Sequence, residues 1–185
     1  MDVEKAINSR FSCRRFMAKK PDWKKIIDAV ESASKAPLAG NIQTIKFILI
    51  SDKKIIQELA KAASQDFVST VRYIVVVCSD KKQCTLSYDR RGEGYSHQQV
   101  GAAIENFLLR ITSLGLASCW VGAFSDSTVR RILDIPEEVE PIAILPIGYA
   151  MGKQKQRTKT SIEHLLYFDK WKNKTMTPIR KVEAR

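Results

Sequence analysis

Apolar residues recur at helical spacing in the middle of the chain, between Ser96 and Leu114. Steps of three and four residues are typical of one stripe of an α-helix. A helix that is apolar nearly all round is expected to be buried, and Gly115 suits the left-handed position that ends it. The stripe comprises Val100, Ala103, Ile104, Phe107, Leu108, Ile111 and Leu114, and Gly101, Ala102 and Leu109 make the other faces largely apolar.

Shorter amphipathic patterns predict further helices, several of which begin at a residue that can cap the first turn. Asp22 is one such cap, and Ser125 or Asp126 is another. A helix is expected to end before Pro37, because the residue before proline is pushed out of the helical region. The predicted helices cover about Val3–Ile7, Asp22–Ala36, Lys53–Ser64, Ser125–Leu133 and a short segment from Thr160–Glu163, which has capping-box spacing.

Short apolar runs between these helices predict buried strands. Pro146 lies inside the last of them, which favours an edge position or an interruption of the pairing. The polar stretch Ser79–Glu93 has no clear periodicity and predicts a mobile loop that covers or borders a site. The predicted strands are Thr44–Ser51, Tyr73–Cys78, Ser118–Gly122 and Ile142–Tyr149.

The totals favour one globular domain, or one domain with appendages. The chain has 185 residues, of which 44% are hydrophobic, so a sizeable core can form. Its first residues are charged rather than apolar, and no apolar run is long enough to span a bilayer. A soluble, cytoplasmic protein is therefore expected. The four cysteines and two histidines show no metal-binding spacing, so reduced thiols and no metal site are expected.

The formal net charge of +11 is compatible with nucleic acid, an anionic membrane surface or anionic ligands. Much of the excess lies near the C-terminus, where no aromatic residues alternate with the cations as in nucleic-acid-binding segments. Most of these cations are interpreted as solvated surface, with no nucleic-acid or membrane partner. A late apolar cluster around Leu165–Trp171 is expected to cover the body or a partner subunit.

Arg10, Ser12 and Arg14 alternate along a short segment near the N-terminus. In an extended chain these side chains point the same way, so two guanidiniums and one hydroxyl converge. That combination suits a phosphate group, which arginine can bind through two parallel hydrogen bonds. The alternative is an ordinary basic surface segment.

Asn41 and Gln43 follow a turn that begins at Pro37. In an extended chain they share a face, and each amide offers both a donor and an acceptor. Such a pair could bind the edge of a heterocycle that carries alternating carbonyl and N–H groups. The alternative is that both amides satisfy the backbone of the turn.

Four separated motifs resemble the nitroreductase family of flavin enzymes. They are R-F-S-C-R-R-F at 10–16, A-P-L-A-G-N-I-Q at 36–43, the stretch Tyr95–Phe124, and Ile135–Pro136 followed by P-I-A-I-L-P-I-G-Y at 141–149. They occur in the family's order and cover about Val3–Trp171. The chain is accordingly divided into an FMN-binding domain at 1–171 and a basic C-terminal tail at 172–185.

The resemblance implies an α+β fold of three layers, with a central, mainly antiparallel sheet flanked by helices. It implies an obligate homodimer that holds one FMN in each of two clefts at the subunit interface. NADH or NADPH would donate hydride to flavin N5, which would pass it to a nitroaromatic, quinone or similar small-molecule acceptor by ping-pong kinetics.

The resemblance also assigns residues by position. Arg10, Ser12 and Arg14 would hold the FMN phosphate, and Arg157 or Lys159 aligns with a late basic phosphate ligand of the family. The ring would be met by Asn41 and Gln43 at its edge, Pro37, Leu38 and Ala39 alongside, and Trp120, Val121 and Gly122 on the reactive side. Because the flavin supplies the chemistry, no catalytic side chain is expected, and backbone at Gly122 would lie near N5.

The ring surroundings depart from the family pattern more than the phosphate motif does. Leu38 replaces a common serine, and Ala117 replaces a glycine. The departures leave open a different flavin chemistry on the same scaffold, such as dehalogenation or oxidation of a biosynthetic intermediate. A flavin-binding protein without catalytic activity is a further alternative.

Overall fold

One antiparallel sheet organises the computed structural model, which describes residues 1–152 and 156–176. In the described chain its strand order is β1-β2-β4-β3. The strands are β1 Ile45–Ile50, β2 Tyr73–Asp80, β3 Ala117–Ser118 and β4 Val139–Gly148. All three strand pairings are antiparallel, so the predicted sheet type is confirmed.

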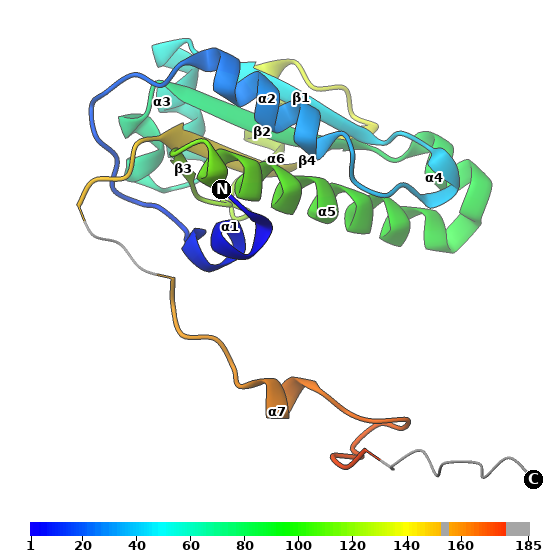
Figure 1. The fold of residues 1–185 in the computed structure, drawn as a ribbon. Helices are drawn as coiled ribbons and strands as arrows, with labels where there is room; N and C mark the ends of the chain where they lie inside the picture. The colour runs from blue at the N-terminus through cyan, green and yellow to red at the C-terminus, as the bar shows by residue number, and fades with distance from the viewer. Residues whose placement is uncertain (153–155, 177–185) are drawn as a thin grey trace, which may run out of the picture.

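Helices flank the sheet on both faces (Figure 1). N-cap side chains explain where several helices begin. Asp22 accepts a hydrogen bond from the backbone N–H of Lys24, and Asp52 accepts from the backbone N–H groups of Lys54 and Ile55. Short 3₁₀ turns occur at Ala39–Asn41, Asp66–Thr70 and Asp89–Arg91. The α-helices are α1 Val3–Ser9, α2 Trp23–Ala33, α3 Lys53–Ala62, α4 Lys82–Tyr88, α5 Gly92–Ser113, α6 Asp126–Leu133 and α7 Ile162–Leu165.

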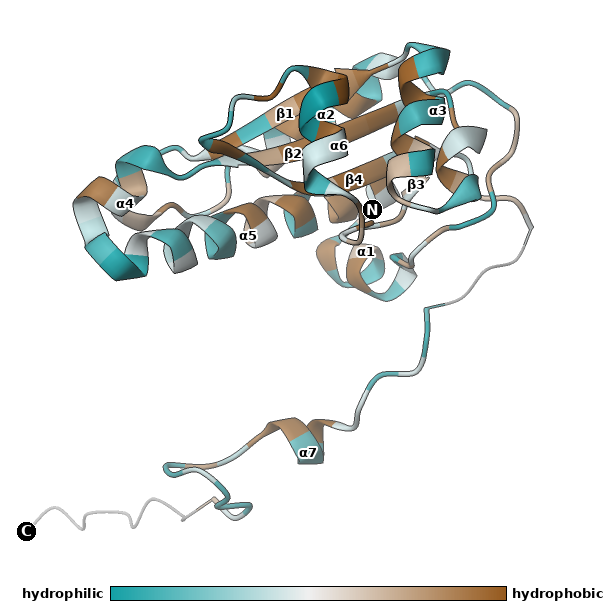
Figure 2. Cartoon of the chain, turned by 180° about the vertical axis from the view of Figure 1, so that it is seen from behind, coloured by the Kyte–Doolittle hydropathy of each residue, from teal (hydrophilic) through white to brown (hydrophobic). Residues whose placement is uncertain are grey.

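Alternating side chains of β2 feed two separate cores. Ile74 and Val76 pack on the face covered by α3 and α6, whereas Val75 and Val77 pack on the face covered by α2 and α5. All four are fully buried, and each such burial contributes roughly 1.5–3 kcal/mol. Figure 2 shows the hydrophobic colour concentrated in the strands, with hydrophilic residues on the outer sides of the helices. The sheet is thus the rigid middle layer, and the expected three-layer α+β architecture is confirmed.

The prediction of a loop at Ser79–Glu93 is wrong. Strand β2 continues to Asp80, α4 covers Lys82–Tyr88, and α5 already begins at Gly92. Only Cys84 is buried within α4, so this helix has too few apolar positions to give a periodic signal. Tertiary packing of the helix against α5, rather than its own pattern, explains its presence.

Two further sequence expectations need correction. Helix α5 ends as predicted, with Gly115 at a φ of +75°, but it is not buried all round. Gly101, Ala102 and Leu109 lie half-buried on an outward stripe. The predicted strand at Ser118–Gly122 is paired regularly only through Ser118, and after it only a single bridge joins Val121 to Ile144.

Pro146 lies in β4, between β2 and β3, rather than in an edge strand. On the β3 side, Ser118 pairs with Ile147 and the next bridge joins Val121 to Ile144. Pro146 falls in the gap between these pairs, where no ladder hydrogen bond requires its missing N–H. The expected interruption is therefore present, although the edge position is not.

The described C-terminal segment, 156–176, extends away from the sheet and its helices as an arm (Figures 1 and 2). Its helix α7 exposes Ile162 and Leu165 to 66% and 64%. The late apolar cluster thus does not cover its own body. The predicted tail at 172–185 is described only as far as Met176, and the remainder lies outside the described residues.

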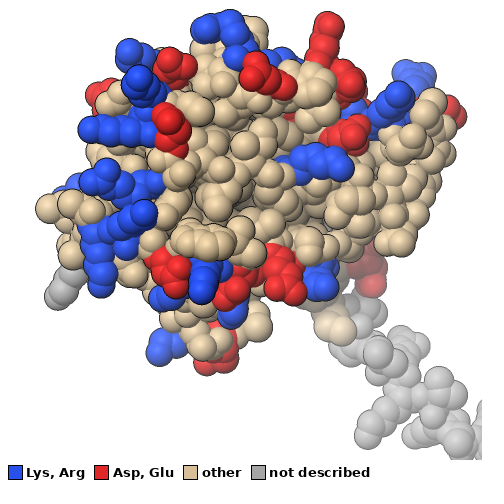
Figure 3. All heavy atoms as spheres, turned by 90° about the horizontal axis from the view of Figure 1, so that it is seen from above, with Lys and Arg blue, Asp and Glu red and all other residues tan. Residues whose placement is uncertain are grey.

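The surface mixes both signs of charge. Figure 3 shows the molecule from the side of α2 and β1. Lys and Arg are most numerous towards one end of this face, Asp and Glu lie among them, and a broad uncharged area occupies the middle. Among the described residues, no helix combines the length and apolar character that crossing a membrane requires.

Candidate active site

The segment Arg10–Phe16 is extended, as one of the two readings of its spacing predicts. Ser12 bridges Ser118 of β3, and the N–H of Cys13 donates to the Ser118 carbonyl at 2.9 Å. Further along, Phe16 bridges Ala150 just after β4. Backbone pairing at both ends therefore holds the segment against the sheet with alternate side chains on one side.

A cavity of about 190 Å³ opens over this segment. Among the described residues, four cationic side chains line it, from opposite ends of the chain, together with one hydroxyl. They are Arg10, Ser12, Arg14, Arg157 and Lys159. Both candidates for the late basic ligand thus reach the same cavity. Phe11 and Gln156 complete the lining.

Two contacts orient the early arginines. The Nε of Arg10 forms an ion pair with Glu105 of α5 at 3.1 Å. The guanidinium of Arg14 lies over the Phe67 ring, 6.0 Å from its centroid. Such contacts reduce the conformational entropy that is lost when an arginine binds an anion. The cavity is therefore partly organised before any ligand enters.

Cys119 lies directly behind Ser12. Its side chain is buried, and burial raises the pKa of its thiol, while the nearby Arg14 charge and a hydrogen bond with Ser12 act in the opposite direction. All four cysteines are buried, and none is in a disulfide. Burial likewise raises the pKa of the Cys78 thiol to about 11. Both thiols are consequently neutral at physiological pH and poor nucleophiles.

The second predicted cluster, at Pro37–Gln43, does not have the expected geometry. Ala39–Asn41 form a 3₁₀ turn in which Gly40 and Asn41 have φ angles of +56° and +59°. Asn41 and Gln43 are therefore not an extended pair that shares a face. Gln43 Oε1 accepts from the N–H of Ile45 at 3.2 Å, which is the backbone-satisfying alternative. The Asn41 side chain is exposed.

Gln99 of α5 holds this turn in place, and the sequence motifs did not identify it. The N–H of Ala39 donates to Gln99 Oε1 at 2.5 Å, and Gln99 Nε2 donates to the Thr44 hydroxyl at 2.8 Å. Gln99 is 4% exposed and Thr44 is fully buried. The Gln99 amide is buried, and both its oxygen and its nitrogen are hydrogen-bonded. Moving the turn away would break one of these bonds and leave a buried polar group unsatisfied, which costs free energy, so the turn is held firmly.

A cavity of about 280 Å³ lies between this turn and α5. Its lining includes all three predicted residues Pro37, Leu38 and Ala39, together with Tyr95, Gln98, Gln99 and Ala102. Helix α4 contacts residues beside this cavity, since the Tyr88 hydroxyl approaches Gly40 and its ring meets Tyr95 edge-on at 5.2 Å. The segment predicted as a loop thus borders the site as a helix.

In the third predicted group, Trp120–Gly122, Trp120 and Gly122 lie at the surface and Val121 lies in the core. The Trp120 side chain is 39% exposed and lies next to Gly101 and Gly122, which leave room for the indole. Val121 is 2% exposed and bridges Ile144, so its side chain belongs to the core. Gly122 is exposed, and its backbone is accessible where no side chain intervenes. Only backbone and indole are therefore open to a ligand here.

Comparison with known proteins shows the family to which the chain belongs. A model of the nitroreductase family matches residues 7–83 and 63–149. The chain belongs to the nitroreductase family. A nitroreductase-family enzyme was expected from the four motifs, and that expectation is confirmed.

Relatives of this nitroreductase-family chain carry different names. A Methanocaldococcus jannaschii nitroreductase is 36% identical over 102 residues, which are 55% of this chain and 50% of that protein. An Archaeoglobus fulgidus protein named NADH dehydrogenase/NAD(P)H nitroreductase is 29% identical over 78% of this chain and 83% of its own length. The iodotyrosine deiodinase of Thermotoga neapolitana is 26% identical over 76% of this chain and 84% of its own length.

The fold has a close counterpart among solved structures. The NADPH:FMN oxidoreductase of Vibrio harveyi, solved with NAD⁺, superposes with a TM-score of 0.83 at 17% identity. The match covers 92% of this chain and 78% of that one. At this identity the similarity establishes the shared nitroreductase-like fold.

Proposed function

We propose that this nitroreductase-family protein is an FMN-dependent NAD(P)H oxidoreductase. The observation that carries the proposal is the cavity lined by Arg10, Ser12, Arg14, Arg157 and Lys159. A phosphate monoester carries nearly two negative charges and accepts several charge-assisted hydrogen bonds. Four cations and one hydroxyl around a cavity of this size fit that group, so these residues would hold the FMN phosphate.

The flavin ring would be bound by the turn and the Trp120–Gly122 segment. Pro37, Leu38 and Ala39 would lie along it. The exposed amides of Asn41 and Gln43 would approach its edge separately, and Gln43 would offer only its Nε2 because its Oε1 is bonded to the Ile45 N–H. Trp120, Val121 and Gly122 would border its reactive side, where the exposed backbone of Gly122 leaves space for a nicotinamide or an acceptor. Bound FMN would supply hydride transfer from NADH or NADPH to the acceptor, while the chain binds, orients and shields the reactants.

A homodimer is part of the proposal. The phosphate cavity and the cavity beside the turn share no lining residue within one chain, which favours a ring site completed by a second copy. The half-buried outer stripe of α5 and the exposed apolar residues of α7 provide surface for that copy. Burying such apolar area would stabilise the association.

The acceptor is expected to be a nitroaromatic, a quinone or a similar small molecule. The similarity to an iodotyrosine deiodinase supports a second candidate, reductive dehalogenation. The two differ in the product, because dehalogenation releases halide whereas nitro or quinone reduction does not. Halide release from an iodinated phenol, assayed with prereduced protein, separates them.

The decisive experiment is an absorption spectrum of the purified protein followed by titration with FMN. We expect a flavin spectrum that NADH or NADPH bleaches under anaerobic conditions and that a quinone restores. A colourless protein that takes up no FMN on titration contradicts the proposal. Salt serves as a control, since colour should persist at salt concentrations that screen exposed charges.

The dimer is tested by light scattering on the full chain and on a chain that ends at Thr160. The shortened chain keeps Arg157 and Lys159 but lacks α7. We expect a dimer for the full chain and weaker association for the shortened one. A full-length monomer at micromolar concentration contradicts the dimer.

A further inference from the structure

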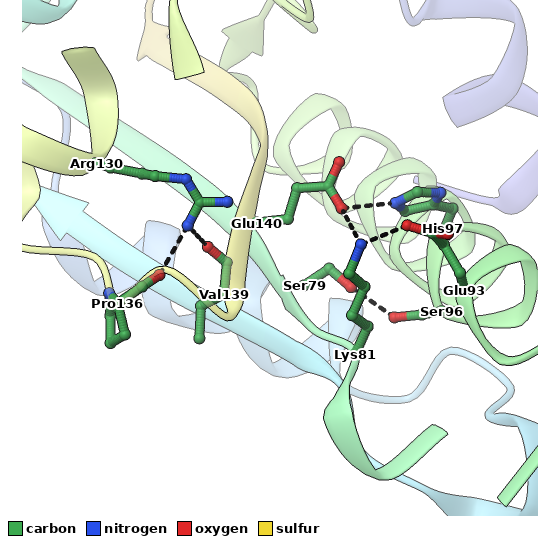
Figure 4. Close-up of polar contacts among 9 residues, drawn as sticks. All are labelled: Ser79, Lys81, Glu93, Ser96, His97, Arg130, Pro136, Val139 and Glu140. Carbon is green, nitrogen blue, oxygen red and sulfur yellow. Dashed lines mark hydrogen bonds and ion pairs between the residues drawn. The ribbon is translucent and has the colours of Figure 1, made fainter. Parts of the chain in front are cut away.

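A mixed cluster of charged side chains lies on the side of the sheet where β2 ends, β4 begins and α5 starts (Figure 4). Glu93 and His97 come from α5, Glu140 from β4, and Lys81 from the residue after β2. His97 Nε2 lies 3.0 Å from Glu140 Oε2, and Lys81 Nζ lies 3.6 Å from the same oxygen. Lys81 also forms an ion pair with Glu93. None of these residues lines either cavity of the candidate active site.

Three of these side chains have the chemistry and spacing of metal ligands. Glu93 and His97 are one helical turn apart, so they project from the same face of α5. One ligand atom from each of Glu93, His97 and Glu140 falls within 4.8 Å of the others. An imidazole with two carboxylates suits zinc and other divalent transition metals. Cysteine and histidine spacing gave no sign of this group, because Glu140 is distant in sequence.

We infer that Glu93, His97 and Glu140 bind a divalent transition metal ion, of which Zn²⁺ and Ni²⁺ are suitable probes, and that the ion displaces the ammonium of Lys81. Lys81 already holds a positive charge between the two carboxylates (Figure 4). The long lysine side chain can move into solvent when the metal enters.

Neighbouring contacts fix the spacing of the ligands. The hydroxyls of Ser79 and Ser96 are both fully buried and hydrogen-bonded to each other at 2.5 Å, which ties β2 to α5 beneath the cluster. Arg130 donates to the carbonyls of Pro136, at 2.7 Å, and Val139, and so fixes the chain that leads to Glu140. Ligands on rigid elements lose little entropy on metal binding.

Isothermal titration of the tag-free full-length protein with ZnCl₂, repeated with NiCl₂, tests the inference. We expect one saturable site per chain and at least about tenfold weaker binding in His97→Ala. His164→Ala is the matched control, because His164 is the second of the two histidines and lies in α7. Absence of saturable binding, or equal losses in both variants, overturns the assignment.

Lys81→Met tests the displacement directly. Removing the competing charge should tighten metal binding several-fold, whereas a metal site elsewhere would leave the affinity unchanged and overturn the displacement. Glu140→Gln provides a second ligand variant if His97→Ala fails to fold, and it should also weaken binding. Flavin content is measured in each preparation, so that loss of metal binding is distinguished from failure of the proposed FMN site.

Discussion

The phosphate cavity and the Pro37–Gln43 turn are built in different ways. The cavity collects charged side chains that point towards a common space, and two of its arginines are oriented by Glu105 and Phe67. The turn offers backbone and uncharged side chains, and a buried amide from α5 holds its shape. The cavity would thus bind the phosphate by charge, and the turn would bind the flavin ring by shape. Binding by charge depends on individual cationic side chains, whereas binding by shape depends on the contacts that hold the turn in place.

The largest effect is expected from removing a cation at the charged end. Arg14→Ala should weaken FMN binding by about 2–3 kcal/mol, roughly a hundredfold, because hydrogen bonds to charged groups contribute most. Riboflavin, which lacks the phosphate, should bind both proteins equally. Fluorescence titration with each ligand measures this. Arg131→Ala, an exposed arginine of α6, is the control. Equal losses for FMN and riboflavin would contradict the assignment of Arg14.

Removing the support of the turn should weaken the binding of FMN and riboflavin alike. Gln99→Leu leaves the Ala39 N–H and the Thr44 hydroxyl without their partners and should weaken ring binding by about 2 kcal/mol. FMN and riboflavin should lose affinity by the same factor, roughly thirtyfold. Thr44→Val should have a smaller effect, since only one bond of the amide is lost. A loss of affinity for FMN but not for riboflavin would contradict the role of Gln99 in ring binding, because it would link Gln99 to the phosphate instead.

The two late cations allow a finer test of the charged end. Arg157 and Lys159 both line the cavity, so each alanine variant should weaken FMN binding by about 1 kcal/mol, or fivefold. The double variant should lose more than either single one and leave riboflavin binding unchanged. If one single variant behaves as wild type, the other residue alone is the late phosphate ligand.

A change in the turn itself is expected to have a similarly small effect, on stability rather than on phosphate binding. Gly40 has a φ of +56° and lies against the Tyr88 hydroxyl, so Gly40→Ala should destabilise the protein by about 1 kcal/mol. Thermal unfolding measures the loss. Adding Tyr88→Phe should recover part of it by removing the crowding oxygen. No recovery would mean that backbone strain alone causes the loss.

The contrast also explains which parts the sequence could predict. The early phosphate residues are neighbours in the chain, and their extended conformation follows from alternation, so the trio Arg10, Ser12 and Arg14 was recognisable. Helices with a capping Asp22 or Ser125 and strongly apolar strands were predicted within a few residues of their ends. These features depend on local sequence, which is why they could be inferred.

Features that depend on distant contacts were missed. The bond between Ala39 and Gln99 joins residues 60 positions apart, and no motif links them. Helix α4 was predicted as a loop because its only buried residue is Cys84. The prediction that Asn41 and Gln43 share one face of an extended segment was wrong, because the chain turns at Gly40 and Asn41, which have positive φ angles. Each is fixed by tertiary packing rather than by local periodicity.

The phosphate cavity joins a segment that precedes the sheet to one that follows it, because Arg10, Ser12 and Arg14 line the same space as Arg157 and Lys159. During translation the first three side chains emerge early, but their counterparts leave the ribosome only after the whole sheet has been synthesised. A nascent chain therefore lacks the complete set of phosphate-binding cations until the segment after β4 has been synthesised. Cofactor loading would then be a late event that follows folding of the scaffold and cannot guide its earliest steps.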